Sequence, residues 1–91
     1  MSDMHFKPSE ELTFETVEKD RARLILSLKN SKISSLCFDL SQVKHCDSAG
    51  LALLIEAKRL CKEYKKIFSI DEMPKEVYAL AEFCGVKTIL S

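Results

Sequence analysis

The residues of this chain best suited to chemistry are Asp47 and Ser48, which stand where a long helical pattern begins. Both are favoured N-cap residues, because their side-chain oxygens accept hydrogen bonds from the free N–H groups of a first turn. A cap of this kind contributes ~1 kcal/mol to stability, and this is the simplest interpretation of the pair. A phosphate on Ser48 would add about −1.5 to −2 charge units beside Asp47. The serine is therefore also a candidate phosphorylation switch.

Catalysis and metal binding have little support in this sequence. The two histidines, His5 and His45, stand in no recognisable triad, and the two glycines form no phosphate-binding loop. No two cysteines form a C-x-x-C pair, and adjacent residues such as His45-Cys46-Asp47 rarely converge on one metal ion. We therefore predict that the protein is not an enzyme and that it uses no cofactor and no metal.

The four cysteines are predicted to be free thiols, because their spacing and the inferred compartment disfavour disulfides. Cys37, Cys61 and Cys84 lie within apolar patterns, where a free cysteine behaves as a small hydrophobic residue. Cys84 in particular falls on the inward face of a predicted helix. Cys46 is the exception, since it stands in a predicted loop just before Asp47.

Length and charge limit the class of protein. The 91 residues are enough for one domain, which we place over residues 1–91. The 14 basic and 14 acidic residues cancel, so no net field draws the chain to nucleic acid or to anionic lipid. No apolar run approaches the ~18 residues of a membrane span, and the first residues lack the apolar core of a signal peptide. These features predict a cytoplasmic protein that does not insert into a membrane.

Short apolar runs alternate with helical periodicities, and this alternation positions Asp47 and Ser48. A strand over 33–40 leads to the pair, and a helix over about 48–64 starts there. The other predicted elements are an edge strand over 4–8, a helix from Thr13 or Thr16 to about 30, a strand over 67–70 and a helix capped by Asp71 and ended by Gly85. In a competing interpretation 23–28 is a strand, and 86–90 is either a last strand or a packed tail. The β-α-β-α-β-α order predicts an α/β fold with right-handed crossovers.

The predicted helix after Asp47 has two apolar surfaces. At 100° per residue, its broad core face carries Leu53, Leu54, Ala57, Leu60, Cys61 and Tyr64. On the polar side, positions i, i+4, i+7 and i+11 form a ridge of Ser48, Ala52, Ile55 and Arg59, with Leu51 beside it. A contiguous apolar patch rimmed by charge is typical of a contact site. An alternative of equal weight is that a loop or the first helix covers Leu51 and Ile55.

Two stretches of the sequence resemble the signature of STAS domains, a family named for sulphate transporters and anti-sigma factor antagonists. They are Phe38-Asp39-Leu40-Ser41-Gln42-Val43 and Asp47-Ser48-Ala49-Gly50-Leu51-Ala52-Leu53-Leu54. The resemblance covers roughly residues 10–90 and implies a small mixed β-sheet with helices packed against it. It also implies a longer N-terminal β-hairpin. Residues 1–9 have room for only one short strand, so we expect this N-terminal strand region to be truncated.

Two functional branches share this signature. In anti-sigma factor antagonists, the serine that matches Ser48 is phosphorylated by a partner kinase that is also the anti-sigma factor. In the other branch, a stand-alone STAS subunit binds the ATPase of the Mla-type phospholipid ABC transporter, which moves lipid between bacterial outer and inner membranes. The run from Gly50 to Glu56 is more similar to the transporter branch. The favoured partner is therefore an ABC transporter ATPase, and an anti-sigma factor kinase is the alternative.

Both branches imply a protein-interaction site at the start of the long helix. The expected footprint contains Asp47, Ser48, Ala49, Gly50, Leu51, Ala52, Ile55 and Arg59. Within it, Ser48 is the residue expected to carry a phosphate. The transporter branch further implies that the cytoplasmic chain lies at the periphery of the inner membrane, held there by the transporter complex.

Overall fold

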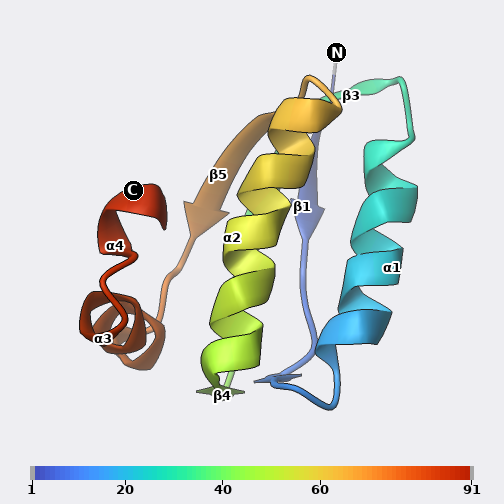
Figure 1. Ribbon diagram of the computed structural model, residues 1–91. Coiled ribbons are helices and arrows are strands. Elements are labelled where there is room, and N and C mark those ends of the chain that lie inside the picture. The colour runs from blue at the N-terminus through green and yellow to red at the C-terminus, as the bar shows by residue number, and fades with distance from the viewer. Residues whose placement is uncertain (1, 91) are drawn as a thin grey trace.

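The computed structural model describes residues 2–90, in which helices pack on one side of a small parallel sheet (Figure 1). The elements are β1 (Ser2–Phe6), β2 (Glu11–Leu12), α1 (Val17–Leu28), β3 (Ile33–Asp39), β4 (His45–Cys46), α2 (Ser48–Glu63), β5 (Ile67–Asp71), α3 (Lys75–Phe83) and α4 (Lys87–Leu90). The predicted alternation of strands and helices is confirmed. The two-residue strands β2 and β4 are additions that the sequence pattern did not predict.

The main sheet has the strand order β1-β3-β5, and a smaller sheet pairs β2 with β4. Every pairing between the described strands is parallel, so the expectation of a mixed sheet is wrong. The physical reason is the connections: α1 lies between β1 and β3 and α2 lies between β3 and β5, and a helical crossover brings the next strand back in the same direction. β1 forms one edge, in place of the longer hairpin that the family resemblance implied.

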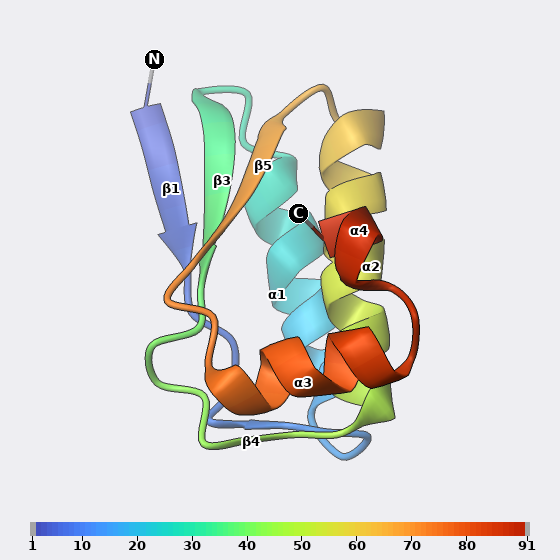
Figure 2. The same cartoon turned by 90° about the vertical axis from the view of Figure 1, so that its left-hand side faces the viewer.

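The main sheet has one apolar face, which α1 and α2 cover (Figure 2). Along β3, Leu36 and Phe38 are buried, whereas Cys37 between them is half-buried on the opposite face. The Phe38 ring packs edge-on against Phe6 of β1 at 5.0 Å and Phe68 of β5 at 6.2 Å between centroids. Parallel sheets are usually covered on both faces. Here the alternation of apolar and polar residues leaves one face free of helices within residues 2–90.

The third helix begins and ends in recognisable ways. Its N-cap is Pro74, so the predicted cap at Asp71 is wrong, and Asp71 is the last residue of β5. The predicted stop at Gly85 is confirmed, because this residue has φ 73°, in the left-handed region that glycine adopts most easily. The N–H of Val86 then donates to the carbonyl of Ala81, five residues earlier, at 2.9 Å. This is the hydrogen bond that defines a Schellman motif.

The C-terminal residues pack on the domain as a short helix rather than as a strand. Leu90 of α4 is buried in the core, so the packed-tail alternative is confirmed. Cys84 is exposed, because it is the C-cap of α3 and lies where the chain turns away from the core, and its predicted inward position is wrong. Residues 23–28 lie within α1, which excludes the competing strand interpretation.

Candidate functional site

Asp47 joins the start of α2 to the loop that precedes α1. It is the N-cap of α2, and its Oδ1 accepts a hydrogen bond from the N–H of Gly50 at 2.9 Å. Its Oδ2 accepts a second hydrogen bond, from the N–H of Phe14 at 3.0 Å. The cap predicted from the sequence is therefore confirmed, and the carboxylate also fixes a loop that is distant in sequence.

The two hydrogen bonds set the charge state of Asp47. The N–H groups of Phe14 and then Gly50 lower the pKa of this carboxyl below its ordinary value of 3.8, because both bonds favour the ionised form. A charged carboxylate at the positive end of the α2 dipole is favourable as well. Asp47 is therefore ionised at neutral pH and is occupied by backbone donors, which makes it a positioning group for the site.

Gly50 lies where β2 crosses the first turn of α2. A Cβ atom at this position would come within 2.0 Å of the Leu12 carbonyl oxygen and 2.9 Å of the Cys46 sulfur. Only glycine allows this approach, because any side chain would push a backbone atom away. Gly50 is buried, so its predicted place in the partner footprint is corrected to a packing role.

Leu51 belongs to the core and not to an exposed ridge. Its side chain is only 3% exposed and is part of the core, in a helix that contacts both β2 and β4. The alternative that a preceding segment covers Leu51 is therefore the one that the structure supports. Ile55 is half-buried and packs against the core. The predicted continuous apolar ridge is interrupted at both positions.

The other predicted footprint residues of α2 line two different grooves. Ala49 and Ala52 face α1, whereas Ile55 and Arg59 face β5 and α4. Arg59 is exposed and makes ion pairs within α2 with Glu56 and Glu63. Ala49 and Ala52 therefore line one groove, next to the exposed Ser48 in the sequence, and Ile55 and Arg59 line another.

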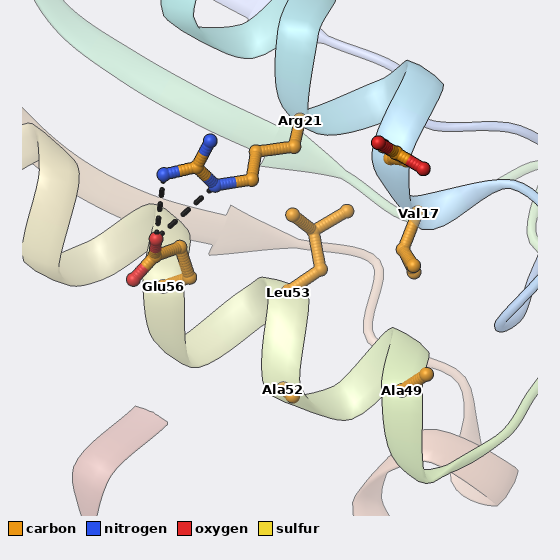
Figure 3. Close-up of a pocket in the computed structure, with 7 residues that line it drawn as sticks. Val17, Arg21, Ala49, Ala52, Leu53 and Glu56 are labelled. Carbon is orange, nitrogen blue, oxygen red and sulfur yellow. Dashed lines mark hydrogen bonds and ion pairs between the residues drawn. The ribbon is translucent and has the colours of Figure 1, made fainter.

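A groove of about 490 Å³ runs between α1 and α2, and we call it the α1–α2 groove. It is lined by Val17, Glu18, Arg21, Ala49, Ala52, Leu53 and Glu56 (Figure 3). Its small and aliphatic residues remain accessible, since Ala52 is exposed and Val17 and Ala49 are half-buried. Figure 3 shows Leu53 pointing from α2 toward α1 across its floor. The groove is thus an apolar depression between two helices, with charged residues at its rim.

An ion pair closes one end of the α1–α2 groove. Arg21 of α1 donates to the same carboxylate oxygen of Glu56 through Nε at 3.2 Å and NH2 at 3.0 Å (Figure 3). Hydrogen bonds from Arg59 and Arg21 lower the pKa of Glu56, so this carboxylate is charged at neutral pH. The pair spans the two helices and fixes their spacing at this end of the groove.

Phe14 is a candidate contact residue that the sequence analysis did not assign to the site. Its side chain is 78% exposed, although its backbone N–H is held by Asp47. A phenylalanine inside a polar loop, between Thr13 and Glu15, was the available signal. The hydrogen bond to Asp47, the residue before Ser48, places the Phe14 backbone next to the start of α2.

The two buried thiols, Cys46 and Cys61, are not activated. Cys46, expected in an open loop, is buried in β4, and burial together with the charges of Asp47 and Glu76 raises its pKa to about 11. Burial likewise raises the pKa of Cys61 to about 11.

Within residues 2–90, no three side chains among His, Cys, Asp and Glu lie close enough together to bind a metal ion. In the same residues, no helix combines the length and apolar character needed to cross a bilayer.

The chain is similar to known proteins both in sequence and in fold. A family model described as "Mlab, STAS domain" matches residues 3–91. Among solved structures, the chain is similar to a sulfate transporter family protein from Wolinella succinogenes, with a TM-score of 0.76 and 15% sequence identity. That alignment covers 98% of this chain and 71% of the other. No curated protein matches the sequence. The structural likeness, at this identity, concerns the fold: a small α/β domain with a sheet and helices.

Proposed function

Because the chain belongs to the STAS-domain family, we propose that it is the accessory subunit that binds and regulates the ATPase of an Mla-type phospholipid ABC transporter. STAS domains typically act as protein-interaction modules, so the subunit works by contact and carries out no catalysis. It resides in the cytoplasm and reaches the inner membrane through the transporter complex. The name Mlab in the family description supports this branch, as does the similarity of the run from Gly50 to Glu56.

The observation that carries the proposal is an apolar surface with a charged rim at the start of α2. Phe14 is largely exposed, and the α1–α2 groove beside it presents Val17, Ala49 and Ala52 to solvent. Burying one such aromatic side chain in a partner contributes roughly 1.5–3 kcal/mol. Glu18 at the rim provides the polar border that protein interfaces usually have. We propose that the ATPase docks on Phe14 and this groove.

Ser48 gives a specific reason to keep the antagonist function as a second candidate. It is the first residue of α2, is exposed and lies at the edge of the proposed docking surface. A kinase could therefore reach its hydroxyl, and the helix N-terminus would tolerate the added phosphate. A partner seated on Phe14 and Ala49 would meet that negative charge directly. In the antagonist function, the partner is an anti-sigma factor kinase and the phosphate ends the contact.

Co-purification distinguishes the two functions. We expect the chain to form a stable complex with the transporter ATPase from the same genome and to change its rate of ATP hydrolysis, while the isolated chain hydrolyses no ATP. Failure to bind that ATPase, together with binding to a kinase-like anti-sigma factor and phosphate transfer to Ser48, would establish the antagonist function. A Ser48→Ala variant is the control, because it lacks the phosphate acceptor but retains Asp47 as the cap.

A further inference from the structure

A second groove lies on the side of α2 that faces away from α1. It has a volume of about 530 Å³ and runs between α2, β5 and α4, and we call it the basic groove. It is lined by Ile55, Lys58, Arg59, Lys62, Lys66, Phe68 and Ile89. None of these residues lines the α1–α2 groove, so the molecule has two separate concave surfaces, one on each side of its central helix.

Three lysines of the basic groove carry charge that no carboxylate balances. Lys58, Lys62 and Lys66 make no ion pair with any acidic residue in the described part of the chain. Lys58 donates to the carbonyl of Ile89, and Lys66 donates to the carbonyl of Ile33 at 2.7 Å. Carbonyl acceptors orient an ammonium group but do not cancel its charge. The groove therefore has a local positive potential although the whole chain is neutral.

The floor of the basic groove is apolar. Ile55 of α2 and Phe68 of β5 are half-buried, and Ile89 of α4 is 45% exposed. The bond from Lys58 to the Ile89 carbonyl links α4 to α2 and keeps this wall in place. An apolar floor below a rim of unbalanced cations is complementary to a chain that carries both carboxylates and apolar side chains.

The basic groove continues along β5 toward α3. An adjoining depression of about 370 Å³ shares Lys58 and Phe68 with it and extends over Ser69, Ile70, Met73 and Leu90. β5 is an edge of the main sheet, since among the described strands it pairs only with β3. An elongated depression beside a sheet edge suits an extended peptide, which is a common mode of peptide recognition.

We propose that the basic groove binds an extended acidic segment of a partner protein, with apolar side chains on its floor and carboxylates against Lys58, Lys62 and Lys66. A flat anionic bilayer fits less well, because its surface would meet the cationic rim but would not reach a recessed floor. This proposal does not depend on the ATPase contact, since that contact uses the opposite side of α2.

Fluorescence anisotropy with a synthetic peptide tests the proposal. The probe is a short labelled peptide that alternates glutamate with leucine, and two further probes replace either every glutamate by glutamine or every leucine by serine. We expect the first probe to bind and each replacement to weaken binding by about tenfold or more. Lys62→Glu should reduce affinity for the first probe by a similar factor. The Lys62 side chain is exposed and makes no ion pair among residues 2–90, so thermal unfolding should change little, by no more than a reversed charge in the last turn of α2 costs.

Lys19→Glu is the matched control, because Lys19 is also exposed but lies on α1, outside the basic groove. It makes the same change in net charge and should alter affinity by less than about twofold. Equal losses in both variants, or unaltered binding of the serine peptide, would reduce the effect to general electrostatics and overturn the proposal. Absence of binding to the first probe would overturn it too. Sedimentation with phosphatidylglycerol vesicles, without peptide binding, would assign the groove to a membrane surface instead.

Discussion

Single residues at the start of α2 have structural roles that constrain which of them can contact a partner. Asp47 uses both carboxylate oxygens within the chain, one for Gly50 and one for Phe14. Ser48, directly after it, remains exposed. The pair that the sequence analysis treated as one motif is therefore divided: the aspartate positions the helix and the loop, and the serine is left free for modification or contact.

Asp47→Ala should lower the free energy of unfolding by about 1–2 kcal/mol, because it removes the cap of α2 and the acceptor for Phe14. The folded state lowers the pKa of Asp47 below 3.8, so the stabilisation is complete above that pH and is lost as the pH falls through the folded-state pKa. Urea unfolding of the unaltered protein and of Asp47→Ala, at neutral pH and near pH 3, measures how this stability difference depends on pH. A difference that does not change with pH would contradict the assigned role of the charge.

Gly50→Ala should be more harmful than its small size suggests. The new methyl group would lie 2.0 Å from the Leu12 carbonyl oxygen, so β2 or α2 must move. We expect a loss of about 3 kcal/mol or more in the free energy of unfolding, at the upper end for overpacked sites. Gly85→Ala is the comparison, since it has open space and suffers only from its φ of 73°, at about 1–2 kcal/mol. If denaturant titrations gave equal losses of unfolding free energy for the two variants, β2 would be able to move away from the new methyl group, contrary to this prediction.

At the scale of the elements, local pattern predicted the long helices and the central strand well. The helical spacing of Leu53, Ala57 and Leu60 fixed the core face of α2, and all three are buried. The alternation along β3 likewise matches its place in the middle of the sheet. The core face of α2 and the alternation along β3 depend on residues only a few positions apart, so both could be predicted from the sequence alone.

The same reasoning failed where distant segments meet. β2 and β4 have two residues each, too few for a recognisable period, and they pair only because the fold brings them together. Both short strands contact α2, and Leu51 of that helix is buried, although the helical pattern had placed it on the polar side. For this reason the helical pattern alone did not predict which apolar residues at the start of α2 are exposed.

Leu51→Ala should cost about 2–5 kcal/mol, as expected for a buried leucine, and Leu53→Ala should cost a similar amount. Ala52→Ser, between them on the exposed side, should change stability by less than about 0.5 kcal/mol. Chemical denaturation of the three variants gives the comparison. A small loss for Leu51→Ala, near that of Ala52→Ser, would return Leu51 to the surface and restore the predicted ridge.

At the scale of the whole molecule, α2 is the central element and separates two surfaces of different character. Figure 1 shows α1 on one side of it and α3 and α4 on the other. The α1–α2 groove adjoins an exposed aromatic residue, whereas the basic groove is rimmed by unbalanced lysines. Under the two proposals made above, each surface binds a different protein segment, one on the α1–α2 groove and one on the basic groove.

Calorimetric titration of the transporter ATPase with Phe14→Ala and Phe83→Ala tests the proposed function most directly. Both phenylalanines are largely exposed, at 78% and 89%, so neither change should alter the free energy of unfolding appreciably. Phe83 lies on α3, on the other side of α2 from the α1–α2 groove. We predict that Phe14→Ala weakens binding by more than tenfold, about 1.4 kcal/mol, and that Phe83→Ala binds as the unaltered protein does. Unchanged affinity for Phe14→Ala, or an equal loss for Phe83→Ala, would contradict docking at the start of α2.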